Sequence, residues 1–253
     1  MIILHILRSI LIYIVVFFGF ILISLVLLPL LWIIGLFSKD ARERTARCFS
    51  DAALSFLRII TGSKSIVIGA ENVPDEAVLF VANHRSYFDI VSIYPFFHGR
   101  RLGFVGKKEF TAFLPFRLWM EWIGCLFIDR DNPREGLKAI NAAAEDIQNG
   151  KSIWIYPEGT RGHEEENLPF HAGSFRIAEK AGCKIVPAAQ CHADDVFEKH
   201  IPLIKPAKII TVFGKPYSTE GLDRQELREL YKTAEEECRR LYNEYKYFLS
   251  KRV

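Results

Sequence analysis

A long apolar run lies at the start of the chain. No charged residue occurs between Ser9 and Ser38, and residues 10–28 consist almost entirely of Ile, Leu, Val and Phe. A run of this length exceeds the ~18 apolar residues that indicate a membrane segment. Pro29 lies within it and is expected to kink the helix or to split it into two arms. The segment therefore either crosses a bilayer or dips into one leaflet, and we favour dipping.

A basic amphipathic stretch follows the apolar run. Its four basic residues are Lys39, Arg42, Arg44 and Arg47. Apolar residues then recur at helical spacing over residues 46–60, and Arg8 is the only Lys or Arg before the run. Because basic residues gather on the cytoplasmic side of membrane segments, the bulk of the chain is expected to face the cytoplasm. We predict a membrane anchor with an interfacial helix over residues 1–60 and a domain over residues 61–253.

Short apolar runs alternate with helix signals along the rest of the chain. Buried strands are expected at residues 77–82, 152–156, 184–189 and 208–213. Helices are expected from Ser86, over residues 132–149, over residues 173–181, and from Thr219 or Asp223 to about residue 249. This alternation is typical of an α/β domain with a mostly parallel or mixed sheet covered by helices.

Charge and cysteine content narrow the functional class. The net charge is +3, which argues against a nucleic-acid-binding protein that relies on bulk electrostatics. The five cysteines are scattered, and no pair has metal-ligand or redox spacing. We therefore expect packed thiols in a reducing compartment and no metal site.

A histidine lies between a predicted strand and a predicted helix in VANHRSYFDI, residues 81–90. Open α/β sheets bind ligands at this edge. A helix N-terminus favours the neutral imidazole, so His84 is a candidate general base, and Asp89 can fix its tautomer. Alternatively, Asp89 only closes a capping box with Ser86. The chain contains no Gly-x-Ser-x-Gly nucleophile motif, so the base is expected to activate a substrate hydroxyl or water.

Two further strand ends carry an arginine. GCLFIDRDNP places Arg130 between two aspartates, and SIWIYPEGTRG leads a strand into Glu158, Gly159, Thr160 and Arg161. Guanidinium groups bind phosphate or carboxylate oxygens bidentately, so both arginines can hold an anion. The alternatives are an ion pair with a neighbouring aspartate for Arg130 and a solvated loop charge for Arg161.

Together these motifs resemble those of the glycerolipid acyltransferases. NHRSYFD is similar to the family's His-x4-Asp signature, and YPEGTR is similar to its Glu-Gly-Thr-Arg signature. GCLFIDR, KIVPAA and FGKPY resemble three further blocks of the family. The order and spacing are similar to those of the 1-acyl-sn-glycerol-3-phosphate acyltransferases over residues 69–217. The small size and the apolar N-terminus resemble the bacterial members, which implies a bacterial cytoplasmic (inner) membrane with the catalytic domain on its cytoplasmic face.

The resemblance implies a reaction and its participants. A fatty acyl group would pass from an acyl carrier protein or coenzyme A thioester to the sn-2 hydroxyl of lysophosphatidic acid, giving phosphatidic acid. His84, oriented by Asp89, would be the base, without an acyl-enzyme and without a cofactor beyond the acyl co-substrate. The alternatives are another lysophospholipid or a lyso-aminolipid as acceptor, a membrane-bound thioesterase, and a lipid-binding scaffold without activity.

The resemblance also assigns the binding of the acceptor. Residues 158–161 would bind it, with Arg161 on its phosphate. Arg130 would assist, and Lys107 or Lys108 of GKKEF would face the same phosphate. The lysines can equally belong to a solvated face or bind anionic membrane lipids. We interpret the aromatic residues within 110–127 as core, with an acyl channel or a membrane contact as alternatives.

Overall fold

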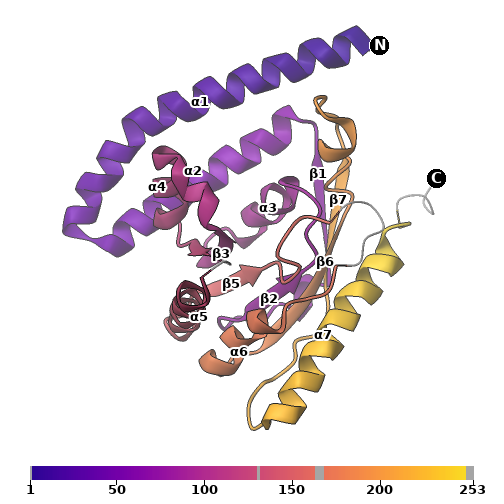
Figure 1. Ribbon diagram of the computed structural model, residues 1–253. Helices are drawn as coiled ribbons and strands as arrows, with labels where there is room; N and C mark the ends of the chain where they lie inside the picture. Colours follow the sequence, from indigo (N-terminus) through magenta and orange to yellow (C-terminus); the bar gives the residue numbers. More distant parts are fainter. Residues whose placement is uncertain (1, 130–131, 163–167, 249–253) are drawn as a thin grey trace.

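A seven-stranded mixed sheet lies between two layers of helices in the computed structural model (Figure 1), which describes residues 2–129, 132–162 and 168–248. The strands are β1 (Lys64–Ile68), β2 (Leu79–Ala82), β3 (Leu102–Lys107), β4 (Leu126–Ile128), β5 (Ser152–Ile155), β6 (Ile185–Cys191) and β7 (Lys208–Phe213). Their spatial order is β1-β7-β6-β2-β5-β3-β4. Neighbouring strands from β6 to β4 are parallel, whereas β7 is antiparallel to β6. The predicted α/β class is confirmed.

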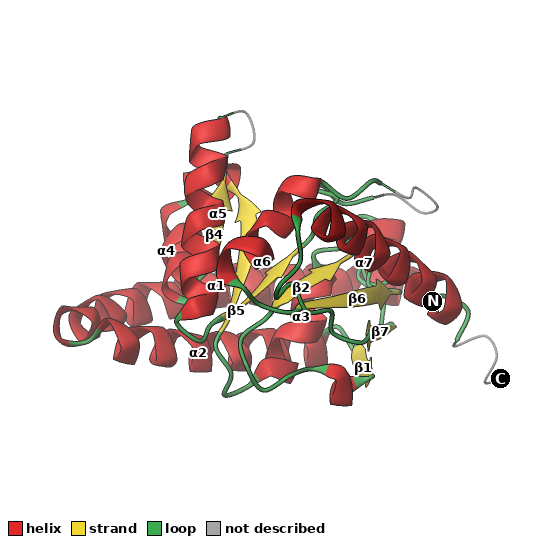
Figure 2. Cartoon of the chain, turned by 90° about the horizontal axis from the view of Figure 1, so that it is seen from below, coloured by secondary structure: helices red, strands yellow, loops and turns green. Residues whose placement is uncertain are grey.

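Helices cover both faces of this sheet. They are α1 (Ile2–Phe37), α2 (Lys39–Ile60), α3 (Phe88–Ile93), α4 (Leu114–Trp122), α5 (Pro133–Gln148), α6 (Arg176–Ala181) and α7 (Arg224–Tyr245). Buried residues of α5, α6 and α7 pack on one face, and residues of α2, α3 and α4 pack on the other. Figure 2 shows the strands turning progressively across the sheet, as its twist requires.

Alternate side chains of β2 point to the two faces of the sheet. Leu79 and Val81 join the core beneath α5, α6 and α7, whereas Phe80 and Ala82 join the opposite core. On that second face, Phe80 stacks on Trp154 of β5 with ring centroids 5.3 Å apart. Burying side chains of this size stabilises the fold by roughly 1.5–3 kcal/mol each. Both cores therefore anchor β2, the strand that leads into the predicted histidine motif.

All four predicted strands are present as β2, β5, β6 and β7, but β1, β3 and β4 were not predicted. Strand β3 contains two glycines, which usually weaken a strand. At Gly103 a Cβ atom would lie 2.3 Å from the carbonyl oxygen of Gly124, so the close approach of these two segments requires glycine. Strand β4 is only three residues long, too short to carry a recognisable alternation.

The helix starts in this part of the chain follow local capping, with one correction. Asn132 caps α5 as expected, because its side chain accepts from the backbone N–H groups of the first turn. Asp223 caps α7 in a capping box with Glu226, whereas the hydroxyl of Thr219, the other expected start, donates to the carbonyl of Cys183. The helix expected over residues 173–181 is a 3₁₀ turn, Ala172–Phe175, followed by α6.

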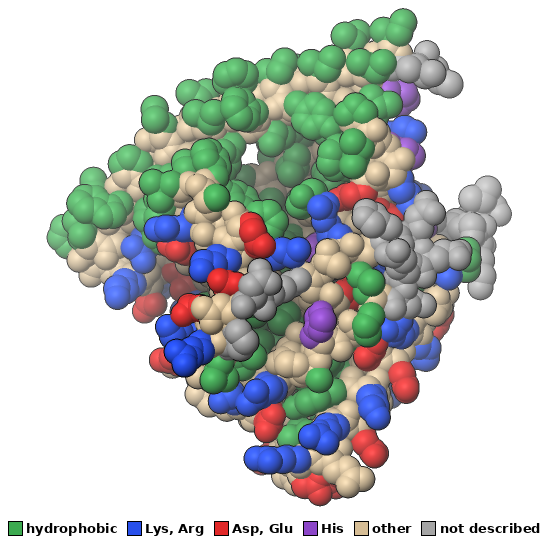
Figure 3. Space-filling model, viewed as in Figure 1, with side chains coloured by type: hydrophobic (Ala, Val, Ile, Leu, Met, Phe, Trp, Pro, Cys, Tyr) green, Lys and Arg blue, Asp and Glu red, His purple; other side chains and the backbone are tan. Residues whose placement is uncertain are grey.

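Helix α1 is continuous through Pro29, so the predicted split into two arms is wrong (Figure 1). A proline removes one backbone hydrogen bond, and the bonds on either side hold the helix together. By length and composition, residues His5–Phe37 could cross a membrane. Figure 3 shows hydrophobic side chains along this helix and charged side chains over the rest of the same view.

Helix α1 folds back along α2 and is bound to the domain at several points. Arg8 donates to the carbonyl of Thr61, and Tyr13 donates to the carbonyl of Pro202. Further along the helix, the Ser24 hydroxyl accepts from the indole N–H of Trp119 at 2.9 Å. Leu31 is fully buried against α2 and α4. Contacts near its start and in its second half therefore hold the apolar helix against the rest of the chain.

Two expectations for the N-terminal helices need correction. Arg47 does not lie on a lipid-facing surface, because it is buried and donates to the carbonyl of Leu102 at 2.8 Å. Cys48 is exposed, whereas the other four cysteines are packed as expected. Helix α2 ends at Ile60, and the predicted domain boundary at this residue stays a prediction.

Candidate active site

The predicted site residues gather at one edge of the sheet. Strands β2, β5, β3 and β4 are parallel neighbours, so their carboxyl ends lie side by side (Figure 1). His84 follows β2, the Glu158–Arg161 loop follows β5, Lys107 ends β3 and Asp129 follows β4. Arg130 lies outside the residues that the structure describes. The edge where this topology places ligands thus brings together the described residues that the motifs indicated, and their roles stay predictions.

His84 and Asp89 form a direct pair. The imidazole Nδ1 of His84 lies 2.7 Å from Oδ2 of Asp89. Asp89 is fully buried, whereas the side chain of His84 is 20% exposed. Since the carboxylate accepts the Nδ1 proton, the neutral ring carries its lone pair on Nε2, the nitrogen suited to take a proton from a substrate.

Asp89 also closes the turn in which it lies. Its Oδ2 accepts from the backbone N–H groups of Arg85 and Ser86, each at 2.8 Å. The Ser86 hydroxyl accepts from the N–H of Phe88, and α3 begins at Phe88 rather than at Ser86. The expected start at Ser86 is therefore two residues early. The capping contact and the histidine contact occur together, because one carboxylate oxygen serves both.

A stacked tyrosine, which sequence reasoning missed, supports the other side of His84. The ring of Tyr156 lies 4.1 Å from that of His84, with 12° between the planes. Its hydroxyl donates to Oε1 of Gln190 at 2.9 Å, and Nε2 of Gln190 donates to the carbonyl of Asp89 at 2.8 Å. Burial raises the pKa of Tyr156, so the hydroxyl keeps its proton. The alternation of β5, which turns Trp154 and Tyr156 to the same face, was the available signal.

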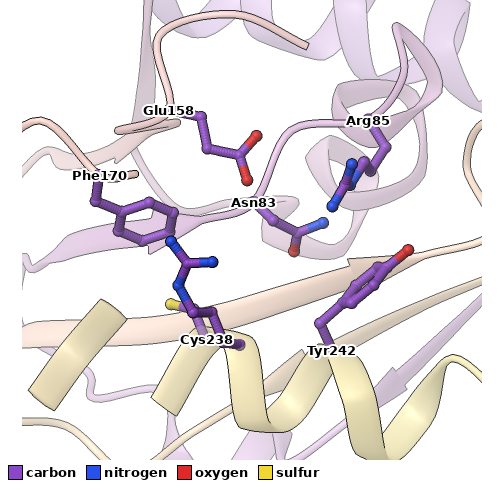
Figure 4. Close-up of a pocket in the computed structure, with 7 residues that line it drawn as sticks. Asn83, Arg85, Glu158, Phe170, Cys238 and Tyr242 are labelled. Atoms are coloured by element: carbon purple, nitrogen blue, oxygen red, sulfur yellow. The ribbon is translucent and has the colours of Figure 1, made fainter. Parts of the chain in front are cut away.

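Glu158 holds the backbone of His84. Its Oε2 accepts from the backbone N–H of His84 at 3.2 Å, and the N–H of Gly162 donates to the His84 carbonyl at 2.9 Å. Burial raises the pKa of Glu158 to about 7. Figure 4 shows Glu158 turned towards Asn83 and Arg85, above Cys238 and Tyr242 of α7. This residue therefore contacts the histidine turn from inside, and its predicted contact with an acceptor stays a prediction.

The turn after Glu158 brings Arg161 to the surface. Gly159 has a φ of 78°, a left-handed conformation that glycine adopts without strain. Thr160 is exposed, and the side chain of Arg161 is 33% exposed. The guanidinium carbon of Arg161 lies 3.7 Å from the centre of the Tyr87 ring. The arginine is thus held over the histidine turn, and the alternative of a freely solvated loop charge is wrong.

A carboxylate that no motif indicated is paired with Arg161. Nη1 of Arg161 lies 3.1 Å from Oε1 of Glu198, which belongs to the 3₁₀ turn Glu198–His200. The same carboxylate accepts from the Ser86 hydroxyl at 2.6 Å and from the N–H of Tyr87 at 3.0 Å. Glu198 lies between the KIVPAA and FGKPY blocks and belongs to neither, so only the folded structure brings it to this edge.

The two predicted lysines differ in their surroundings. Lys107 is half-buried at the end of β3, whereas Lys108 is exposed. Lys108 donates to Oδ2 of Asp129 at 3.0 Å, and this bond raises its pKa. Within residues 2–129, 132–162 and 168–248, no group of three His, Cys, Asp or Glu side chains is placed to hold a metal.

The aromatic run after the lysines has two environments. Trp119 and Trp122 are buried against α1 and α2, as the core interpretation predicted. Phe110, Phe113 and Phe116 are exposed, which the core interpretation did not predict. Phe113 and Phe116 lie near Phe20 of α1. This segment therefore connects the α/β part of the chain to the apolar helix.

Comparison with known families decides the classification. The family model described as Acyltransferase matches residues 64–190, half of the chain and the part that holds both leading motifs. The chain belongs to the acyltransferase family. The predicted resemblance is confirmed.

Individual relatives of this acyltransferase family member carry more specific names. The 1-acyl-sn-glycerol-3-phosphate acyltransferase of Saccharomyces cerevisiae is 29% identical over 189 residues, which cover 73% of this chain and 60% of the relative. The enzyme of the same name from Haemophilus influenzae is 29% identical over 154 residues, covering 60% of this chain and 62% of the relative. The chain thus spans about three fifths of these curated relatives.

One solved structure has the same fold. The crystal structure of the 1-acyl-sn-glycerophosphate (LPA) acyltransferase from Thermotoga maritima superposes with a TM-score of 0.71, covering 96% of this chain and 98% of that one. The two sequences are 22% identical. The match includes the N-terminal helices as well as the sheet, because it extends over nearly the whole chain.

Proposed function

We propose that the protein transfers a fatty acyl group from a thioester donor to the sn-2 hydroxyl of 1-acylglycerol 3-phosphate, giving phosphatidic acid. The observation that carries the proposal is the His84–Asp89 pair at 2.7 Å, beside a loop that presents Arg161 at the same sheet edge. A base next to a phosphate-binding group is what an acceptor with both a hydroxyl and a phosphate needs. The names of the relatives agree with this assignment.

The reaction proceeds by direct transfer. Nε2 of His84 takes the proton of the sn-2 hydroxyl while that oxygen attacks the thioester carbonyl. Asp89 fixes the tautomer and stabilises the imidazolium that forms. The tetrahedral intermediate then collapses, the carbon–sulfur bond breaks, and the imidazolium returns its proton to the leaving thiolate. The products are phosphatidic acid, a free thiol and neutral His84.

The environment of Ser86 supports a mechanism without an acyl-enzyme. This serine is the hydroxyl residue nearest in sequence to His84, but it is fully buried. Its hydroxyl donates to Glu198 at 2.6 Å and accepts from the N–H of Phe88 at 2.9 Å. A nucleophilic serine needs its proton directed at the base and its oxygen open to substrate, and neither holds for Ser86.

Acceptor recognition is assigned to the loop after β5. Arg161 would bind the phosphate, because guanidinium matches phosphate oxygens bidentately. Lys107 and Lys108 at the end of β3 would add positive charge, and the backbone of Gly159 and Thr160 would approach the headgroup. The resemblance assigns Arg130 an assisting role. Glu158 contributes by fixing the backbone of His84 from inside.

The setting of the reaction is the surface of a membrane. The acceptor and the product are lipids, while a donor on acyl carrier protein or coenzyme A arrives from water. The exposed apolar surface of α1 and the exposed Phe113 and Phe116 support membrane attachment. We place the active site on the cytoplasmic face of a bacterial inner membrane.

One assay tests the proposed function directly. Purified protein is given labelled 1-acylglycerol 3-phosphate with either acyl carrier protein or coenzyme A thioester, and the lipids are separated by chromatography. Labelled phosphatidic acid, absent with His84→Ala, supports the proposal. Thioester consumption without phosphatidic acid would identify a thioesterase. Acylation of other lysolipids in preference to the phosphate acceptor would change the substrate.

A further inference from the structure

The predicted phosphate-binding arginine already holds an anion from its own chain. Nη1 of Arg161 lies 3.1 Å from Oε1 of Glu198, and Nη2 donates to the hydroxyl of Tyr87 at 3.0 Å. A carboxylate and a phosphate can each offer two oxygens to the N–H groups of a guanidinium. Glu198 therefore stands where the acceptor's phosphate would be bound, if Arg161 is the phosphate ligand.

The position of Glu198 does not depend on the arginine alone. Its other bonds come from the Ser86 hydroxyl at 2.6 Å and the Tyr87 N–H at 3.0 Å. Its side chain is only 11% exposed, compared with 33% for Arg161. When Arg161 turns to another anion, Glu198 keeps two donors and stays in place. Arg161, the more exposed partner, is therefore the partner that moves.

We propose that Glu198 is a specificity-determining residue, an internal anion that competes with the acceptor's phosphate for Arg161. This inference rests on the proposed function. An acceptor recruits Arg161 only if its headgroup attracts the guanidinium more strongly than the carboxylate does. A phosphate monoester carries close to two negative charges at neutral pH and meets this requirement. A lysolipid with a neutral headgroup does not.

The competing pair is connected to the catalytic turn. Ser86 and Tyr87 lie between His84 and Asp89 in the chain, and both donate to Glu198. The guanidinium of Arg161 also lies over the ring of Tyr87. Exchange of Arg161 from carboxylate to phosphate therefore takes place over the same turn that positions the base. In this arrangement Arg161 binds the acceptor's headgroup beside His84, the residue that activates its hydroxyl.

Glu198→Gln is the decisive variant. The amide oxygen can still accept from the Tyr87 N–H and the amide NH₂ can donate to the Ser86 hydroxyl, so the turn keeps its bonds while the charge is lost. The KM for 1-acylglycerol 3-phosphate is expected to fall about fivefold, as for loss of one partly exposed ion pair, with the donor KM unchanged. Inorganic phosphate should inhibit the variant at correspondingly lower concentration.

Asp195→Asn is the matched control. Asp195 lies in the same loop but pairs with His192 at 3.0 Å and with Lys199 at 2.8 Å. Its loss changes the charge of the loop without releasing Arg161, so the acceptor KM should stay constant. An equal fall in the acceptor KM of both variants would mean that only the net charge of the loop matters, and this would overturn the proposal. A rise in the acceptor KM of Glu198→Gln would instead mean that Glu198 binds the acceptor itself.

Two further measurements separate this inference from the proposed function. Calorimetric titration with a water-soluble short-chain lysophosphatidic acid reports binding whether or not turnover occurs, and Glu198→Gln should bind it more tightly than wild type. Unchanged binding refutes the inference while phosphatidic acid synthesis by wild type still supports the function. If Glu198→Gln fails to fold, Glu198→Asp keeps the charge but withdraws it from Arg161, and the acceptor KM should again fall.

Discussion

The imidazole of His84 and the phenol ring of Tyr156 lie face to face, with centroids 4.1 Å apart. Asp89 binds the edge of the same imidazole through Nδ1. The two contacts restrict the ring in different directions, because the carboxylate fixes its rotation and the phenol fixes its plane. The base of the proposed reaction is therefore held by Asp89 of its own NHRSYFD motif and by Tyr156 of the YPEGTR motif.

This stack predicts a difference between two substitutions of Tyr156. Tyr156→Phe keeps the ring and should retain kcat within about twofold, because only the bond to Gln190 is lost. Tyr156→Leu removes the stack, and an aromatic pair is worth about 0.5–1.5 kcal/mol, so kcat should fall about two- to tenfold. The acceptor KM should change little in both variants. Equal losses of kcat would assign the effect to the hydroxyl instead of the stack.

Substitutions in the His84–Asp89 pair test the base itself. His84→Ala should lower the transfer rate by about 10²–10⁴-fold, the usual contribution of a general base. Asp89→Asn should lose less, because the imidazole remains but its tautomer and charge support are weakened. Circular dichroism and membrane flotation check that both variants fold and bind membranes. Near-normal turnover by a folded His84→Ala protein would contradict the mechanism.

Substitution of Arg161 separates recognition from chemistry. Arg161→Ala should raise the KM for 1-acylglycerol 3-phosphate at least tenfold, since a hydrogen bond to a charged group contributes about 1.5–3 kcal/mol. The donor KM should stay nearly constant, while some loss of kcat follows if the phosphate contact also places the hydroxyl. Steady-state kinetics with each substrate varied in turn provides the measurement. An effect confined to the donor would move the phosphate site elsewhere.

The histidine pair was predictable from sequence because it is local. His84 and Asp89 lie five residues apart, and the turn between them sets their distance. Strands β2, β5, β6 and β7 were predictable because burial makes them apolar. By contrast, β3 depends on the contact of Gly103 with Gly124, which no local pattern encodes.

The partners that surround the histidine pair were not predictable. Tyr156 reaches His84 only because β5 pairs with β2. Glu198 reaches Arg161 only because the chain turns back after β6. Such long-range contacts depend on the order of strands in the sheet, which a single sequence leaves open.

The buried carboxyl of Glu158 predicts a dependence of stability on pH. Burial raises its pKa from 4.5 to about 7, so the folded state keeps a proton that the unfolded chain loses. Since the folded state binds more protons between these values, the free energy of unfolding should fall as the pH rises through this window, by up to about 3 kcal/mol. The carboxyl thus destabilises the fold above neutral pH.

Glu158→Gln isolates this contribution. The amide can still accept from the His84 N–H but cannot ionise, so at pH 8 the variant should be more stable than wild type, with little difference at pH 4.5. Denaturant unfolding in detergent at both pH values measures this, with the exposed Glu229→Gln as the control. A wild type whose stability rises between pH 5 and 7, with Glu158→Gln following it in parallel, would contradict the assignment.

The contacts of α1 bear on how the chain meets a membrane. Its 36 residues extend about 54 Å, well beyond the ~30 Å of a bilayer core. Arg8 and Tyr13 near its start and Ser24 and Leu31 in its second half all contact the catalytic part of the chain. A helix that crosses the bilayer would carry its start to the far side, away from those partners. The contacts therefore favour a helix that keeps its start on the same side of the membrane as the rest of the chain, which in the proposed placement is the cytoplasmic side.

Labelling of the extreme N-terminus tests this arrangement. A cysteine is introduced at residue 3 of a variant in which the exposed Cys48 is replaced and the four buried cysteines are kept. It is probed in sealed membranes of known orientation with a reagent that cannot cross them, and the variant without the new cysteine gives the background. The dipping model predicts reaction from the cytoplasmic side only. A cysteine in the exposed part of α7 serves as the cytoplasmic control. Reaction from the outer face alone would establish a transmembrane α1. The contacts of Arg8 and Tyr13 would then have to break in the membrane. The acyltransferase assignment would not change.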